Sequence, residues 1–356
     1  MGGDAVRTPS SELFRAISSG LVPGAVFAAG RAGTIEEVAV AGVAGVSRGV
    51  AREVQRDTLF DLASLTKVVV AAAVLVLVEG SRLDLDDAVR RFIPSFVGEG
   101  RDRVSLRQLL SHNSGLPGEY RFYAQCTSVD EALALLERFP LKYPPGEHTE
   151  YSDLGFMLIG RILETVAGIP LDRLVSDLVL QPLDMQSTMF RPPLEVRDRV
   201  AATSNEPAGT VHDSNSRFFG GVSGHAGLFS SVDDLVKFAG AWLSDDDVPF
   251  LSASLLANAF ANHTAASGGR RGLAWVRRGD PADFLCERWS HSALSHTGFT
   301  GTSLAIDPCC DAFAVLLTNF VYFEKERSNI RSLRERVHRS WGPLGPGSAI
   351  GNAPQD

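Results

Sequence analysis

The stretch that decides the fold is Ser64-Leu65-Thr66-Lys67, which leads directly into an apolar run from Val68 to Val78. Lys67 therefore stands at the head of the most hydrophobic segment of a chain with four lysines and thirty arginines. Burying an unpaired ammonium group is costly, so such a lysine usually finds partners or loses its proton. Ser64 lies three residues earlier, on the same helical face. A serine beside an amine that can lose its proton is the arrangement that Ser-x-x-Lys chemistry requires.

The chain has the composition of a folded globular protein. Its 356 residues are 44% hydrophobic and 21% charged, which allows one large domain or two lobes with a substantial core. The net charge of −8 and the pI of about 5.5 argue against a general nucleic-acid binder, which would carry a basic face.

The sequence shows no sign of export or membrane insertion. Residues 1–7 lack the basic and apolar regions of a signal peptide, and the run 68–78 is too short to span a bilayer. We interpret that run as a buried core helix and expect a cytoplasmic protein without membrane contact. The cysteines have neither metal-ligand spacing nor the pattern of a disulfide scaffold: Cys126, Cys286, Cys309 and Cys310.

Hydrophobic periodicity and turn residues divide the chain into strands, then helices, then strands again. The spacing predicts helices over residues 9–19, 64–79, 106–111, 129–138, 153–167, about 232–242 and 326–340. It predicts strands over residues 24–31, 35–43, 272–278, 301–307 and 311–319.

This order of elements indicates an α/β (α+β) fold with a single catalytic domain over residues 1–340. Both ends of the chain, residues 1–85 and 265–340, are expected to build a lobe with a sheet, and residues 86–264 an inserted helical lobe. The tail 341–356 is rich in glycine and proline, and we expect it to be disordered. The functional site is expected where the two lobes meet.

A second candidate motif is Tyr151-Ser152-Asp153, which follows the Pro144-Pro145-Gly146 loop and opens the helix 153–167. A phenol at such a junction can point into a cleft and relay a proton to and from Ser64 if an ammonium group lies nearby. The alternative is a helix start that Ser152 or Asp153 caps, with Tyr151 packed on the surface.

A third candidate motif is His296-Thr297-Gly298-Phe299, on a strand late in the chain. The glycine permits close approach of a substrate backbone, and His296 could supply a switchable charge or a hydrogen bond. The alternative is a histidine on an edge strand beside turn glycines.

The three motifs, in this order, resemble those of the serine β-lactamase-like family, in the branch of penicillin-binding proteins and class C β-lactamases. Further stretches that look like this family are Phe60-Asp61-Leu62-Ala63, Leu109 to Leu116, Gly224 to Phe229 and Leu316-Leu317-Thr318-Asn319. The resemblance covers residues 20 to 338, nearly the whole chain.

The resemblance implies a β-lactamase-like fold, with an antiparallel sheet flanked by helices, and a role for each motif. Ser64 would be the nucleophile that accepts the acyl group, and Lys67 and Tyr151 the general base and proton relay. The backbone N–H groups of Ser64 and Phe299 would form the oxyanion hole. The substrate would lie along the strand of His296, Thr297 and Gly298.

Two positions depart from the better-known members of the family. Asp153 stands where they have asparagine, and its charge would favour a protonated Lys67. His296 stands where β-lactamases have lysine, so a fixed positive charge for a substrate carboxylate is missing. The pattern therefore fits the esterases, D-amino-acid peptidases and acyltransferases of the family better than its β-lactamases.

Secondary candidates come from a polar loop and a glycine-rich stretch. His212, Asp213 and Asn215 could face the cleft, or they could form local hydrogen bonds in a turn. His225 could approach the site or simply pack. No ligand spacing supports a metal site built from His212, Asp213, His225 and His296, and we expect neither a metal nor another cofactor.

The leading hypothesis is a serine hydrolase that forms an acyl-Ser64 intermediate from a small-molecule ester or amide. If the acyl group passes to an amine or alcohol instead of water, the protein is an acyltransferase, and the sequence leaves this choice open. A non-catalytic penicillin-binding or sensor domain is the rival class, and a metallo-hydrolase is the third. The sequence does not indicate the oligomeric state.

Overall fold

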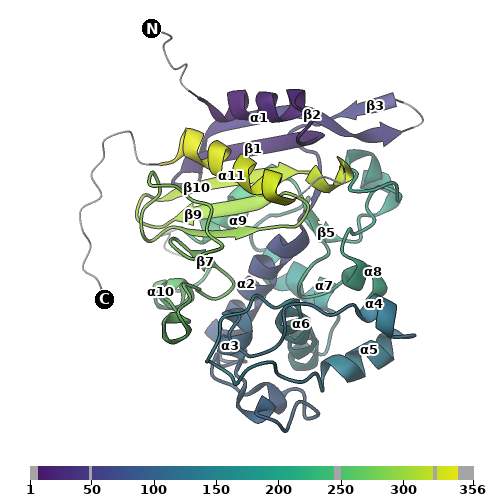
Figure 1. Cartoon of the computed structure of the whole chain (residues 1–356), viewed down its shortest axis with the longest axis vertical. Coiled ribbons are helices and arrows are strands. Elements are labelled where there is room, and N and C mark those ends of the chain that lie inside the picture. The colour runs from purple at the N-terminus through teal and green to yellow at the C-terminus, as the bar shows by residue number, and fades with distance from the viewer. Residues whose placement is uncertain (1–6, 48–49, 244–249, 324–326, 344–356) are drawn as a thin grey trace.

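The main sheet has seven antiparallel strands in the order β3-β2-β1-β10-β9-β8-β7 (Figure 1). The computed structural model describes residues 7–47, 50–243, 250–323 and 327–343. The strands are β1 (Gly24–Arg31), β2 (Thr34–Ser47), β3 (Val50–Glu53), β7 (Val276–Arg277), β8 (Leu294–Thr297), β9 (Ser303–Asp307) and β10 (Ala312–Thr318).

The two ends of the chain meet in the middle of this sheet. A tight turn at Ala32 and Gly33, both with positive φ, returns β1 into β2. On its other side β1 pairs with β10, so that Ala28 lies opposite Val315. The expected antiparallel sheet from both chain ends is therefore confirmed.

Helices cover both faces of the sheet, because side chains alternate between the faces along each strand. Leu13 of α1 (Pro9–Ser18) and Leu333 of α11 (Arg327–Trp341) belong to the cluster that contains Phe27. Leu235 of α9 (Val232–Ala241) belongs to the opposite cluster with Val26.

The position of α9 corrects the expected lobe boundary. The range 86–264 was assigned to the helical lobe, yet α9 packs against β10, β1 and β9. The sheet lobe therefore includes a helix from the middle of the chain. An amphipathic pattern shows that one face of a helix is buried, but not which layer covers it.

The helical lobe is built around α2 (Thr66–Glu79), which is apolar all round and packs against α6 (Asp153–Ala167) and α7 (Leu171–Val175) (Figure 1). A helix of this kind belongs in a core, and the expected core helix is confirmed. The other helices are α3 (Leu106–Leu110), α4 (Phe122–Gln125), α5 (Val129–Leu136), α8 (Ser214–Phe218) and α10 (Ala253–Phe260). A small sheet joins β4 (Phe60–Asp61), β6 (Leu228–Ser230) and β5 (Met189–Phe190) in that order.

The helix α6 has the predicted bounds because both of its ends carry clear signals. The Ser152 hydroxyl accepts a hydrogen bond from the N–H of Gly155 at 3.2 Å, and Gly168 ends the helix with φ of 70°.

Two predicted segments differ from the structure. The strand expected over 272–278 shrinks to β7, because Ala274 takes a positive φ of 66° and Arg271 forms a bridge with Val276. In the expected tail 341–356, Trp341 still belongs to α11, and residues 344–356 lie outside the described residues.

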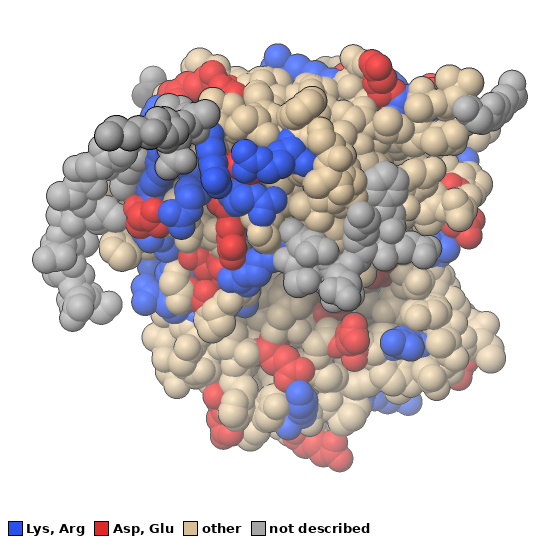
Figure 2. Space-filling view, turned by 45° about the horizontal axis from the view of Figure 1, so that its top comes forward, with Lys and Arg blue, Asp and Glu red and all other residues tan. Residues whose placement is uncertain are grey.

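Basic side chains gather on the face of the sheet lobe shown in Figure 2, with carboxylates among them. On α11 three arginines form ion pairs: Arg331 with Glu335, Arg336 with Glu12 of α1, and Arg339 with Glu287. The pair between Arg336 and the buried Glu12 links the first helix to the last.

In the described part of the chain, no single helix is both long and apolar enough to cross a membrane. By length and composition, α6 and the segment Leu171–Leu180 pass this test only as a pair, which is bent by 82°. All four cysteines are free thiols.

Candidate active site

Ser64 lies in a 3₁₀ turn, Ala63–Leu65, that leads into α2. Ala63 has a positive φ of 47°, a left-handed conformation that costs a non-glycine residue about 1–2 kcal/mol. The buried carboxylate of Asp61 accepts a hydrogen bond from the N–H of Ala63 at 2.8 Å. The turn before Ser64 is therefore held in its strained shape by a fixed acceptor.

Lys67 is completely buried, and oxygen atoms of several residues surround its ammonium group. It donates to the Oγ of Ser64 at 2.9 Å and to the carbonyl of His225 at 3.0 Å. Asp153 Oδ1 lies 2.7 Å from Nζ. The expected contacts of Lys67 with Ser64 and Asp153 are thus both present.

Tyr151 joins Ser64 and Lys67, and its hydroxyl is hydrogen-bonded to both. The Lys67 ammonium lies 4.9 Å from the centre of its ring. Although 36% of the tyrosine surface is exposed, the hydroxyl end points into the buried cluster.

His112 fixes the start of α6 and was not expected to have such a function. Its Nδ1 accepts a hydrogen bond from the N–H of Ser152 at 3.1 Å, and its ring lies 4.5 Å from the ring of Tyr151. Burial lowers the pKa of His112 well below its usual value, so the ring is a neutral acceptor. The sequence signal was His112 within the stretch Leu109 to Leu116, which had no assigned role.

The charges in this cluster distinguish the two outcomes expected for Lys67, which were finding partners or losing its proton. Burial alone lowers the pKa of Lys67, but Asp153 and Tyr151 outweigh it, and the net pKa is raised. Burial likewise raises the pKa of Tyr151, although Lys67 opposes this. Lys67 therefore finds partners and keeps its proton, which is the expected effect of Asp153.

His296 on β8 cannot supply the switchable charge expected of it. Burial, together with the cations Lys67 and Arg271, lowers the pKa of His296 to about 3. The imidazole is therefore neutral at physiological pH. Its ring lies 6.1 Å from the ring of Tyr151.

The turn after β8 lies directly against the turn of Ser64. A Cβ atom on Gly298 would come within 2.4 Å of the carbonyl oxygen of Leu62, so only glycine fits. The hydroxyl of Thr300 donates to the carbonyl of Asp61 at 2.7 Å, and that of Thr302 to Leu62 at 3.1 Å. Thr297 ends β8 and is half-buried.

A pocket of about 610 Å³ opens above Ser64. Tyr151, Asp153 and Phe299 line it beside the serine. Three of the secondary candidates also line it, on a wall formed by the segment His212 to Asn215: His212, Asp213 and Asn215. The ring of His212 stacks on Phe299 with 5.4 Å between the ring centres.

The fourth secondary candidate, His225, lies behind this wall and does not line the pocket. Its ring bridges Asp213 at 2.9 Å and Ser223 at 2.8 Å, while its carbonyl accepts from Lys67. No group of three His, Cys, Asp or Glu side chains that could hold a metal occurs among the residues described.

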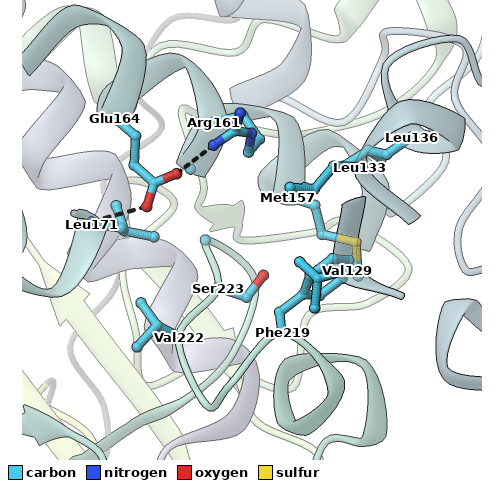
Figure 3. Close-up of a pocket in the computed structure, with 12 residues that line it drawn as sticks. Val129, Leu133, Leu136, Met157, Arg161, Glu164, Leu171, Phe219, Val222 and Ser223 are labelled. Carbon is cyan, nitrogen blue, oxygen red and sulfur yellow. Dashed lines mark hydrogen bonds and ion pairs between the residues drawn. The ribbon is translucent and has the colours of Figure 1, made fainter. Parts of the chain in front are cut away.

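A second cavity, of about 150 Å³, lies between α5, α6, α7 and the loop 219–224 (Figure 3). Leu133, Met157 and Val222 give it an apolar lining, and Arg161 pairs with Glu164 at 2.8 Å beside it. Ser223 lines it as well, so His225, bonded to Ser223 and Asp213, links the lining of this cavity to that of the pocket of Ser64.

Asp61 is a site residue that the sequence reasoning missed. Its second oxygen accepts from the N–H of His212 at 2.7 Å, so one carboxylate ties the turn of Ser64 to the pocket wall that contains His212. Burial raises the pKa of Asp61 to about 6, against the effect of these two N–H groups. A carboxylate three residues before the nucleophile, in an apolar stretch, was the available signal.

Comparison with known proteins covers nearly the whole chain. The sequence model of the family described as Beta-lactamase matches residues 11–338. An N-acetylmuramyl-L-alanine amidase of Bacillus subtilis (strain 168) is 31% identical over 301 residues, which are 74% of this chain and 68% of the relative. A putative D-alanyl-D-alanine carboxypeptidase of Escherichia coli (strain K12) is 31% identical over 303 residues, or 74% and 69% of the two chains.

Solved structures share the fold. The structure of EstCE1, a hydrolase with promiscuous acyltransferase activity, superposes with a TM-score of 0.73 at 23% identity. The match covers 92% of this chain and 97% of EstCE1.

Proposed function

This chain belongs to the beta-lactamase family of serine hydrolases and acyltransferases, and from this premise we propose that it forms an acyl-Ser64 intermediate with small esters or amides. The observation that carries the proposal is the 2.9 Å contact between the Ser64 hydroxyl and the Lys67 ammonium, with the Tyr151 hydroxyl bonded to both. A nucleophile with a proton relay in contact is what acyl transfer needs.

In the proposed acylation, Ser64 Oγ attacks the substrate carbonyl and a new C–O bond forms. The serine proton moves to the Tyr151 oxygen while Tyr151 passes its own proton to the leaving nitrogen or oxygen. Lys67 remains an ammonium and stabilises the partial negative charge that the Tyr151 oxygen carries as its own proton departs, before the serine proton has fully arrived. The backbone N–H groups of Ser64 and Phe299 would receive the oxyanion. When the tetrahedral intermediate collapses, the bond to the leaving group breaks.

The names of the two curated relatives favour amides over simple esters as the natural substrates. One relative is named as an amidase, and the other as a carboxypeptidase for a D-alanyl-D-alanine end. A pocket of about 610 Å³ could also hold an acceptor beside the acyl group, so acyl transfer to an amine stays an alternative.

The test is the intact mass of the protein after brief exposure to an activated ester and, separately, to a penicillin. We expect a mass increase equal to one acyl group, which Ser64→Ala abolishes. Ser214→Ala is the matched control, because Ser214 lines the same pocket and is not part of the cluster. An adduct that persists in Ser64→Ala would contradict the assignment of the nucleophile.

The decay of the acyl adduct then distinguishes hydrolysis from acyl transfer. Loss of the acyl mass in buffer alone indicates a hydrolase. Loss that needs an added amine, with formation of the corresponding amide, indicates an acyltransferase. An adduct that never decays would support the rival class of a binding or sensor domain.

A further inference from the structure

One wall of the pocket is the segment from Gly118 to Tyr123, which the rest of the site holds in place. The carbonyl of Gly118 accepts from the N–H of Asp153 at 2.8 Å. The side-chain amide of Asn215 donates to the carbonyl of Tyr120 at 2.7 Å and accepts from the N–H of Tyr123 at 3.3 Å. This wall is therefore tied to the helix start that carries Asp153 and to the wall that contains Asn215.

Arg121 lies in the middle of this segment and is the one arginine or lysine among the residues that line the pocket. The side chain of Arg121 is exposed. Among the described residues, the guanidinium has no carboxylate within 4.0 Å. An exposed guanidinium keeps its full set of donors in a planar fork that matches a carboxylate.

The other cations near the site are already engaged. Lys67 contacts Asp153, and the buried Arg271 contacts Asp280 at 3.1 Å. His296 stands where β-lactamases have lysine, and because its ring is neutral it supplies no positive charge. Arg121 is therefore the cation of the pocket that is available to pair with a negatively charged group of the substrate.

The carboxylates that line the pocket likewise include paired groups and an unpaired one. Asp153 is paired with Lys67, and Asp213 with His225. Glu119 lines the pocket beside Arg121 and is exposed, and no ion pair joins the two. An incoming carboxylate therefore need not displace an existing partner of the guanidinium.

We propose that Arg121 binds a carboxylate on the substrate, so that the pocket selects esters or amides that carry a free carboxylate away from the scissile bond. This inference rests on the proposed function of Ser64. Tyr120 precedes Arg121 and Tyr123 follows it by two residues, and both line the same pocket, where they can pack against the aliphatic part of such a substrate. Arg121 thus acts as a specificity residue.

The experiment uses two p-nitrophenyl esters of equal length, p-nitrophenyl butyrate and mono-p-nitrophenyl succinate. The wild-type protein should show the higher kcat/KM with the succinate. In Arg121→Gln, kcat/KM for the succinate should fall about tenfold or more, as expected when a charge-assisted hydrogen bond is lost. The value for the butyrate should stay within about twofold. Arg121→Lys should retain part of the preference, because lysine keeps the charge without the fork.

The matched control is Arg90→Gln, which removes an exposed arginine of the helical lobe outside the pocket. It should leave both esters unaffected. An equal loss for both esters in Arg121→Gln, or no preference in the wild-type protein, would overturn the assignment. A preference for an ester with a terminal amine would overturn it in favour of Glu119.

A binding measurement keeps this inference separate from the proposed acyl chemistry. Calorimetric titration of Ser64→Ala with mono-p-nitrophenyl succinate should show binding that the added change Arg121→Gln weakens about tenfold or more. If no ester acylates the wild-type protein but this difference holds, the acyl-enzyme proposal fails and the carboxylate site stands. If acylation occurs and binding does not depend on Arg121, the carboxylate site fails alone.

Discussion

The floor of the pocket, around Lys67, and its mouth, around Arg121 and Glu119, differ in whether their charged groups are paired. At the floor, Lys67 is fully buried and contacts three oxygen atoms at 2.7 to 3.0 Å. At the mouth, Arg121 and Glu119 are exposed and make no ion pair within the described chain. A buried charge needs a partner within the folded protein. An exposed charge can stay unpaired until the substrate binds, because water solvates it. The difference suggests that the floor sets the chemistry and the mouth sets the choice of substrate.

The largest effect should come from removing the cation at the floor. Lys67→Met is expected to lower the rate of acylation by about a thousandfold or more, because it removes the group that stabilises the proton relay. The measurement is the rate at which the acyl adduct appears in the mass spectrum. Lys237→Met, which removes a surface lysine paired with Asp184, is the control and should change the rate less than about twofold. A near-normal rate in Lys67→Met would place the chemistry elsewhere.

The next effect should come from the carboxylate that joins the floor to the wall. Asp61→Asn keeps the shape but can accept well from only one of the two N–H groups, on Ala63 and His212. We expect kcat/KM to fall about thirtyfold, since small displacements of a nucleophile cost up to about a hundredfold. The wild-type protein should also lose activity as the pH falls through about 6, where Asp61 takes up a proton, and the variant should lack this step. A pH profile that is unchanged in the variant would contradict this role.

The raised pKa of Asp61 also predicts how the free energy of unfolding changes with pH. The pKa of Asp61 rises from an ordinary 3.8 to about 6 in the folded protein. The stability that the protonated carboxyl contributes is therefore fully present below about pH 4 and is lost as the pH rises through about 6. The change amounts to about 3 kcal/mol at 1.36 kcal/mol per pKa unit. The difference in unfolding free energy between these pH values should be smaller in Asp61→Asn, as measured by urea titration. An equal difference in both proteins would contradict the assignment.

A smaller effect should come from the partner of Lys67. Asp153→Asn removes the largest influence that raises the pKa of Lys67. If the ammonium form is the active one, the alkaline limb of kcat/KM should move to lower pH, and the rate at alkaline pH should fall about tenfold, as for one charge-assisted hydrogen bond. A rise in rate at neutral pH would instead show that neutral Lys67 acts as the base.

The smallest effect should come from the mouth itself. Asn215→Ala removes the amide that holds the carbonyl of Tyr120 and the N–H of Tyr123. The preference for the carboxylated ester over the neutral one should fall about threefold, because Arg121 becomes less well positioned. Ser214→Ala, next to it on the same wall, should leave the preference unchanged. An equal effect of both variants would show that the mouth does not position Arg121.

The parts that the sequence could predict are those with strong local signals. Ser152 and Gly168 set the ends of α6, and the apolar run 68–78 could only be a core helix. Ser64, Lys67, Tyr151 and Asp153 belong to motifs, and the structure brings them into contact. In each case a few neighbouring residues contain the whole signal.

The parts that the sequence could not predict depend on distant partners. Asp61 acquires its role from the N–H of His212, which is 151 residues away. The pKa values of Lys67 and His296 depend on burial and on charges contributed by other elements. Arg121 is one of thirty arginines, and only the folded chain shows that it faces the pocket.

The alanine before the nucleophile has a consequence for the evolution of stability. Glycine at position 63 would relax the left-handed backbone and recover about 1–2 kcal/mol of native strain, against about 0.5–1 kcal/mol for the added freedom of the unfolded chain. The balance slightly favours glycine, yet the natural residue is alanine. A glycine would also let the turn sample many other conformations, so the alanine keeps the serine in one orientation at the expense of some thermal tolerance.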